Sequence, residues 1–150
     1  MQRRLESTLR RALLAGLCGL VPGVPGASAA TVVVSDAWFR ALPSGLPAGG
    51  YFTLKNAGAA VRLTGAASPA CGMLMLHKSD NSNGMSSMTD VQSVDIAAGG
   101  RIAFAPGGYH LMCMMPSPAM KPGAHVPVTL DFSDHSATTA SFAVKGANGK

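Results

Sequence analysis

The fold class follows most directly from residues 125–132, which read HVPVTLDF. The even positions from Val126 to Phe132 are apolar, whereas Pro127, Thr129 and Asp131 between them are not. A period of two is that of a β-strand with one buried face and one wet face. Pro127 cannot donate a hydrogen bond to a sheet, which indicates an edge position.

Similar short segments follow one another along the chain, separated by turns rich in Gly, Pro, Asn and Asp. The further predicted strands are residues 31–34, 51–55, 60–65, 73–77, 92–96, 101–105, 109–115 and 141–144. Roughly seven to nine strands in a chain of this size predict an all-β fold, an antiparallel Greek-key β-sandwich. Residues 79–87 are polar and are predicted to form a loop.

The first 29 residues are predicted to be a signal peptide. Two arginine pairs precede an apolar run from Ala12 to about Val24, and residues 27–29 are small. This order of charge, apolar run and small residues is typical of an export signal. Cleavage after Ala29 leaves residues 30–150 as one exported domain, long enough for a single core.

Two other export routes stay open as alternatives. The pair Arg10-Arg11 resembles a twin-arginine motif, and Cys18 is a candidate for lipid attachment. Leu9 and Leu17 fit these signals poorly, because a polar and a small residue, respectively, are expected before the two motifs.

The composition of the mature part is unusual only in methionine. Eight of the nine methionines lie between Met73 and Met120. Without residues 1–29 the chain keeps eight basic and six acidic residues, a formal charge of +2, and the basic residues are scattered singly. A nucleic-acid or membrane-surface patch is therefore not expected.

Two of the predicted strands place soft metal donors on one face each. The donors are Met73, Met75 and His77 on the first strand, and His110, Met112 and Met114 on the second. Leu111 and Cys113 fall on the opposite face, toward the core. His110 and Met112 therefore project side by side, as a chelating pair requires.

Imidazole and thioether donors together suit Cu(I), whereas zinc and iron prefer thiolate, imidazole or carboxylate, and calcium requires oxygen. Thioether sulfur also takes no part in thiol–disulfide exchange in an oxidising compartment. The alternative is that these methionines pack the core and that the histidines lie at the surface.

The wider spacing distinguishes these alternatives. Ten residues separate His77 from Met88, twenty-one separate Met88 from His110, and one separates His110 from Met112. This pattern resembles that of the periplasmic copper chaperone family PCu(A)C. Residues 34–40 and the turn Pro-Gly-Gly-Tyr-His at 106–110 also resemble family segments.

The resemblance implies a cupredoxin-like β-sandwich that binds one Cu(I) per chain through His77, Met88, His110 and Met112. It also implies a periplasmic, non-enzymatic chaperone, a monomer without membrane insertion. The implied partners are the copper A centre of cytochrome c oxidase and thiol-containing assembly factors. Lys78 departs from the family, which often has an acidic residue or methionine after the first histidine.

Several residues are left outside the predicted copper shell. Cys71 and Cys113 could form a disulfide, but we expect Cys113 to pack in the core as a reduced, small apolar residue that is not a ligand. Met85 is the best substitute ligand, and His125 and His135 are expected at the surface. Trp38 is expected in the core.

Two other classes of protein remain as alternatives. An electron-transfer cupredoxin requires a cysteine followed closely by histidine, and Cys113 has none before His125. An immunoglobulin-like interaction module would bind no metal. An enzyme is not expected, because no nucleophile and base pair can be identified.

Overall fold

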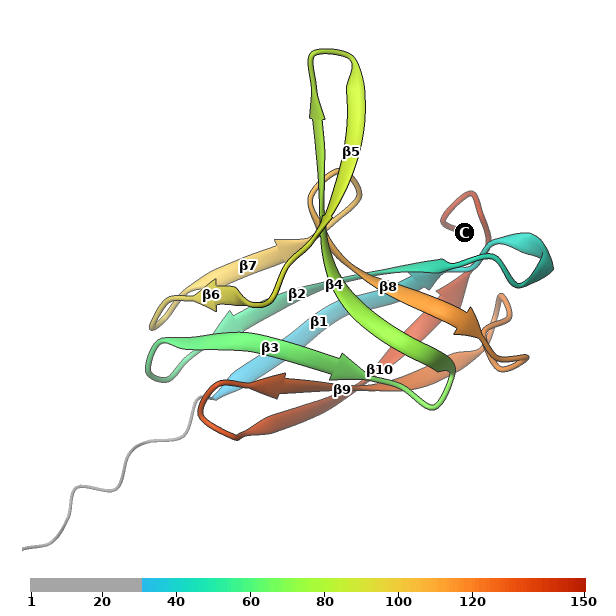
Figure 1. Cartoon of the computed structure of the whole chain (residues 1–150). Helices are drawn as coiled ribbons and strands as arrows, with labels where there is room; N and C mark the ends of the chain where they lie inside the picture. The colour runs from blue at the N-terminus through green and yellow to red at the C-terminus, as the bar shows by residue number, and fades with distance from the viewer. Residues whose placement is uncertain (1–30) are drawn as a thin grey trace, which may run out of the picture.

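The computed structural model describes residues 31–150 as a β-structure, and the predicted signal peptide lies outside the described residues. This part of the chain contains ten strands and one short 3-10 turn, Pro43–Gly45 (Figure 1). The strands are β1 (Val32–Arg40), β2 (Ala48–Asn56), β3 (Val61–Ala67), β4 (Cys71–Ser82), β5 (Met85–Asp90), β6 (Val94–Ile96), β7 (Arg101–Phe104), β8 (Tyr109–Pro116), β9 (His125–Phe132) and β10 (Ala137–Lys145). The predicted all-β class is confirmed. Between residues 31 and 150 no helix is long and apolar enough to cross a membrane.

The strands form one continuous sheet in the order β5-β4-β8-β2-β1-β10-β9-β3-β6, and β7 pairs with β2 beyond the end of β8. The sheet curls over, so that β3 and β9 lie opposite β1 and β2 (Figure 1). β10 links the two layers because it pairs with β1 on one side and β9 on the other. The described pairings are antiparallel except for β1 with β10, which is parallel.

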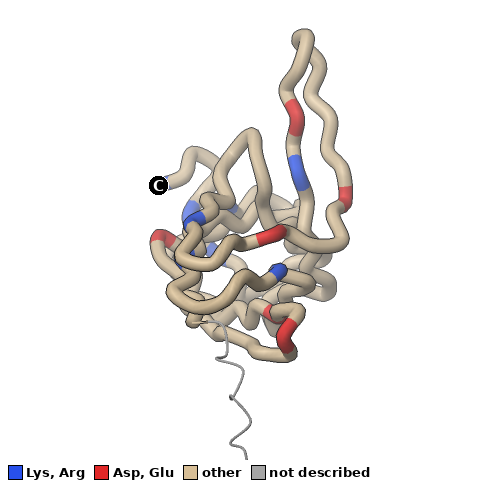
Figure 2. The backbone as a smooth tube through the Cα atoms, turned by 90° about the vertical axis from the view of Figure 1, so that its left-hand side faces the viewer, with Lys and Arg blue, Asp and Glu red and all other residues tan. Residues whose placement is uncertain are grey.

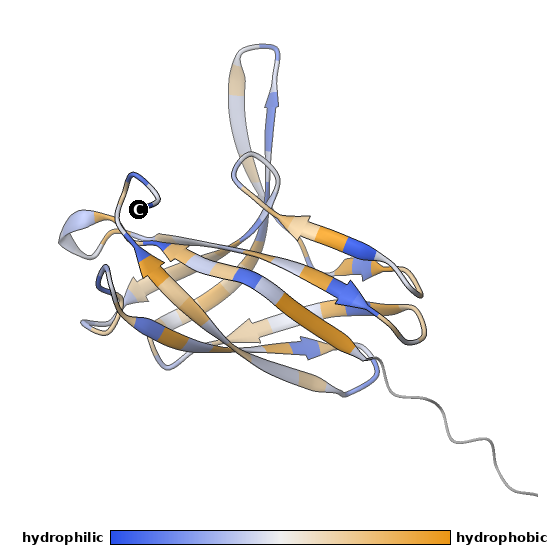
Figure 3. Cartoon of the chain, turned by 180° about the vertical axis from the view of Figure 1, so that it is seen from behind, coloured by the Kyte–Doolittle hydropathy of each residue, from blue (hydrophilic) through white to orange (hydrophobic). Residues whose placement is uncertain are grey.

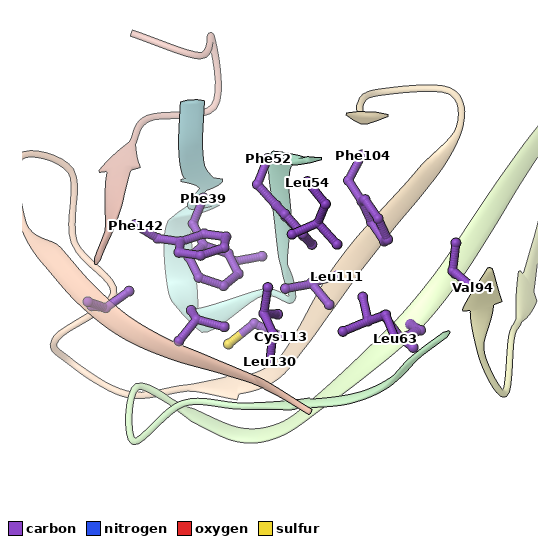
Figure 4. Close-up of a cluster of buried hydrophobic side chains, with 14 of the residues drawn as sticks. Phe39, Phe52, Leu54, Leu63, Val94, Phe104, Leu111, Cys113, Leu130 and Phe142 are labelled. Carbon is purple, nitrogen blue, oxygen red and sulfur yellow. The ribbon is translucent and has the colours of Figure 1, made fainter. Parts of the chain in front are cut away.

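The core fills the space between the two layers. Phe39, Phe52 and Leu54 of the upper layer point toward Leu63 and Leu130 of the lower one (Figure 4). All five side chains are nearly inaccessible to solvent. Apolar and polar residues alternate along the strands, as a sheet with one buried face requires (Figure 3).

Strand β9 has the predicted boundaries, but its predicted edge position is wrong. It pairs with β10 along its length and with β3 from Thr129 to Phe132. Pro127 lies beyond the end of the β3 pairing, opposite Ser141 of β10. An internal strand therefore accommodates this proline where one of its two neighbours is missing.

The predicted loop at residues 79–87 is also wrong, because it forms most of a long β4–β5 hairpin. Asn83 and Gly84 make the turn, with φ angles of 55° and 74°. Asn-Gly is the sequence typical of a two-residue hairpin turn with both residues left-handed. The hairpin projects from the body of the protein (Figures 1 and 2), and every residue of β5 is exposed.

Cys71 and Cys113 form a disulfide bond, so the expectation of a reduced Cys113 is wrong. Cys113 is buried as expected, but Cys71 starts the neighbouring strand, with the two Cα atoms 5.4 Å apart. Strand alternation breaks at this end of the pair, since Met115 has a φ of 49° and is 68% exposed instead of facing the core. The disulfide therefore links β4 to β8, the strands that carry both histidines.

We predict that removal of this disulfide lowers the free energy of unfolding by about 4 kcal/mol, because the bond closes a long loop in the unfolded chain. The Cys71→Ala/Cys113→Ala variant is the appropriate one, since serine would place a hydroxyl in the core. Denaturant unfolding of oxidised wild type and variant measures the difference. Two free thiols in the native oxidised protein, or equal stability, would contradict the prediction.

Candidate metal site

The register of β4 with β8 aligns the predicted donors in pairs. His77 lies opposite His110, Met75 opposite Met112, and Met73 opposite Met114. The two imidazole rings are 5.6 Å apart between centroids and nearly perpendicular. The predicted sharing of faces on these two strands is confirmed, and it brings together two histidines that are 33 residues apart in the sequence.

Met88 reaches the same region from the hairpin. It lies opposite Ser79, two residues beyond His77, so that the Met88 side chain projects on the same side of the sheet as His77. Met88, His110 and Met112 line one open hollow, and His77 adjoins it through its contact with the His110 ring. The structure thus places the four predicted ligands in one neighbourhood.

His110 is held in a form suited to metal binding. Its ring lies 4% exposed, and Nδ1 is 3.1 Å from the carbonyl oxygen of Gly108. A proton on Nδ1 donates to that oxygen and leaves the lone pair of Nε2 free. Burial lowers the pKa of His110, the Gly108 hydrogen bond raises it, and the neighbouring His77 lowers it, with a net decrease.

His77 has buried nitrogens that no other group satisfies. The residue is 8% exposed, and neither Nδ1 nor Nε2 makes a hydrogen bond of normal geometry. Asp90 Oδ1 lies 2.7 Å from Nε2, although this contact lacks hydrogen-bond geometry, and Nδ1 makes no hydrogen bond within residues 31–150. Because buried polar atoms are normally paired, the unpaired Nδ1 fits a site that takes a cation.

The surrounding donors are soft and uncharged. Met112 is half-buried beside His110, while Met88 is 53% exposed on the hairpin. No three residues among the His, Cys, Asp and Glu of positions 31–150 form a metal-binding group. A metal held by His77, His110, Met88 and Met112 would therefore have two imidazoles and two thioethers, the set that suits Cu(I).

Other candidate residues have different surroundings. Met85 is 75% exposed, and strand alternation places it on the opposite face of the hairpin from Met88. Met120 is buried in the core, and Lys78 lies over the ring of Tyr109, 5.5 Å from its centroid. His125 and His135 are exposed as expected, in β9 and in the following turn.

Arg40 is a feature of the hollow that sequence reasoning missed. Its guanidinium lies 5.6 Å from the Trp38 ring and 5.5 Å from the Tyr51 ring, and it lines the hollow with Met88 and His110. Trp38, expected in the core, is half-buried against Tyr51. The buried Nε of Arg40 has no hydrogen-bond partner. In the sequence, Arg40 stands out only as part of the family-like segment 34–40. Its place beside His110 depends on strand pairing, which the sequence pattern does not reveal.

Comparisons with known proteins agree with this fold. The family described as “Putative lipoprotein LpqE-like” matches residues 32–144. The “Putative lipoprotein Lxx21020” of Leifsonia xyli subsp. xyli (strain CTCB07) is 36% identical over 155 residues, which cover 98% of this chain and 93% of the relative. The chain belongs to the LpqE-like family.

Solved structures connect this family with the domain type expected from the sequence. The copper-bound PCuAC domain from PmoF2 matches with a TM-score of 0.63 and 23% identity, over 77% of this chain and 92% of that domain. The solution structure of CuI-DR1885 from Deinococcus radiodurans matches with a TM-score of 0.62 and 30% identity, over 81% of each chain. The resemblance to PCu(A)C proteins is confirmed.

We predict that acid destabilises the metal-free protein through His110. Its folded-state pKa is lowered from 6.5, so the unfolded state takes up protons first as the pH falls. Its contribution to stability is therefore complete above about pH 6.5 and is lost below it. Denaturant unfolding measures the decrease in the free energy of unfolding between about pH 8 and about pH 5.5. This decrease should be smaller for His110→Gln than for wild type. Equal losses would contradict this assignment.

Proposed function

We propose that this protein is a metallochaperone that binds one Cu(I) through His77, Met88, His110 and Met112. The observation that carries the proposal is the register of β4 with β8, which sets two buried histidines side by side. The unsatisfied nitrogens of His77 and the thioethers of Met88 and Met112 beside the rings support it. The 30% identical CuI-DR1885 structure supports the choice of metal.

The charges around the hollow favour Cu(I) over Cu(II). All four proposed ligands are neutral, and the Arg40 cation lines the same hollow as three of them. Repulsion from a fixed cation grows in proportion to the charge of the bound ion. Asp90 contacts His77 and does not itself line the hollow.

The strands suggest how copper is released. His110 and Met112 share β8, which is joined to β4 by the disulfide. Met88 lies on an exposed hairpin strand that, among the described strands, pairs with β4 alone. Fewer contacts make local opening easier, so Met88 detaches first during transfer. The proposed recipient is the copper A centre of cytochrome c oxidase, with thiol-containing assembly factors as exchange partners.

Export is part of the proposal, because the relative and the family carry the description lipoprotein. Cleavage after Ala29 and lipid attachment at Cys18 are the two alternatives for the mature amino terminus. The Cys71–Cys113 disulfide fits an oxidising compartment. It also occupies the Cys113 thiolate that an electron-transfer cupredoxin would need, and the proposed activity is binding and transfer, without catalysis.

We predict that Met88→Leu weakens Cu(I) binding about 10-fold, equivalent to roughly 1.4 kcal/mol, because leucine keeps the apolar volume but has no donor sulfur. His110→Ala should abolish most of the affinity. Competition titration with a Cu(I) chelator measures both.

Met85→Leu is the matched control for this titration, since Met85 is also exposed on the hairpin but faces away from the histidines. Each variant must unfold cooperatively at a denaturant concentration similar to that of wild type. If His110→Ala binds as tightly as wild type, the proposed set of four ligands is wrong. If Met85→Leu weakens binding as much as Met88→Leu, the thioether ligand is misassigned.

A separate prediction concerns the oxidation state. Arg40→Gln should strengthen Cu(II) binding more than Cu(I) binding, with about twice the gain in free energy, because the removed repulsion scales with ionic charge. Lys78→Gln is the control of equal charge, since Lys78 lies over Tyr109 outside the hollow. Parallel titrations with both ions measure the preference. Equal gains for the two ions, or equal effects of the two variants, would exclude a role for Arg40.

A further inference from the structure

Asp90 lies at the base of the hairpin, where the strand that carries Met88 joins the body of the protein. It is the last residue of β5 and lies opposite His77 of β4. Its Oδ1 atom is 2.7 Å from Nε2 of His77, although the Asp90 side chain is otherwise 71% exposed. A carboxylate therefore contacts one nitrogen of a proposed copper ligand from outside the hollow.

The two histidines differ in which nitrogen has a neighbour. In His110 the Gly108 carbonyl oxygen is next to Nδ1, which leaves Nε2 without a partner. In His77 the carboxylate is next to Nε2, and Nδ1 is buried without a partner. A neutral imidazole has one N–H donor and one lone pair, so an acceptor beside one nitrogen leaves the other available to a metal.

We propose that Asp90 is a positioning residue that makes Nδ1 the copper-binding atom of His77, while His110 binds through Nε2. The inference rests on the proposed function. The Asp90 carboxylate accepts a hydrogen bond from Nε2–H of His77 and thereby fixes the tautomer and the orientation of the ring. The 2.7 Å contact lacks hydrogen-bond geometry, and rotation of this exposed side chain would bring Oδ1 into line with Nε2–H.

The contact also connects the hairpin to the site. Asp90 and Met88 are two residues apart on β5, so their side chains project from the same face. Asp90 meets His77 directly, and this holds the strand of Met88 beside the histidine. The Asp90 carboxylate thus determines which nitrogen of His77 binds the metal and also helps to position β5, the strand that carries Met88.

The test is long-range ¹H–¹⁵N spectroscopy of the histidine rings at about pH 8, where histidine is neutral. Cu(I) is diamagnetic, so the copper-bound protein should give spectra as sharp as those of the metal-free protein. In metal-free wild type we expect the proton of His77 on Nε2. On adding Cu(I), Nδ1 of His77 and Nε2 of His110 should shift.

Asp90→Ala should populate both tautomers of His77 and weaken Cu(I) binding roughly 10- to 100-fold, as loss of a partner to a metal-binding histidine does. Asp90→Asn should keep the wild-type tautomer, because its amide oxygen still accepts a hydrogen bond. Asp80→Ala is the matched control, since it removes the same charge from the hairpin at a position opposite Ser87.

Copper on Nε2 of His77, or an Asp90→Ala spectrum identical to that of wild type, would overturn the role of Asp90. Equal loss of affinity in Asp80→Ala would do the same, since the effect would then be one of net charge. These results differ from failure of the proposed function, in which Cu(I) would shift no histidine nitrogen in wild type. The spectrum of the metal-free protein tests whether Asp90 keeps the proton of His77 on Nε2, whether or not the protein binds Cu(I).

Discussion

The antiparallel pairing of β4 with β8 is the constraint on which the rest of the site depends. Because side chains alternate along a strand, one register sends Leu76 and Leu111 into the core and brings His77 beside His110. A slip of either strand by one residue would move the histidine of that strand to the core face. The packing of two leucines therefore maintains the spacing of two imidazoles, and the disulfide fixes the same register at the far end of the pair.

The site combines a rigid part with an accessible part. His110 and Met112 lie on a strand that has neighbours on both sides, whereas Met88 lies on the outermost strand of the sheet. A cargo site needs both properties, because donors must be positioned before the ion arrives and one of them must be able to leave. Arg40 adds a positive charge at the hollow, and Asp90 adds a negative charge beside His77.

The sequence predicts the parts of this structure that depend on strand alternation. Strand β9 has the expected boundaries, and the faces of His77 and His110 follow from counting by two. Sequence patterns alone did not predict features that depend on which strands are neighbours. Cys71 meets Cys113 and Arg40 reaches the hollow only because strands distant in sequence are paired. The hairpin was missed although Asn83-Gly84 is a strong turn signal, since polar residues on both faces of β5 show no alternation.

The direction of strand β1 separates the hollow from the amino end of the described residues. Strand β1 runs from Val32 at one end of the sheet to Arg40 at the hollow, and nine extended residues span about 30 Å. In Figure 1 the strand starts at the end of the sheet opposite the turn Pro43–Gly45. A chain tethered near its amino end would thus hold the candidate metal site at the far end of the molecule. The length of one strand would act as a spacer between the tether and the candidate site. The site would then face a protein that approaches from the side away from the tether.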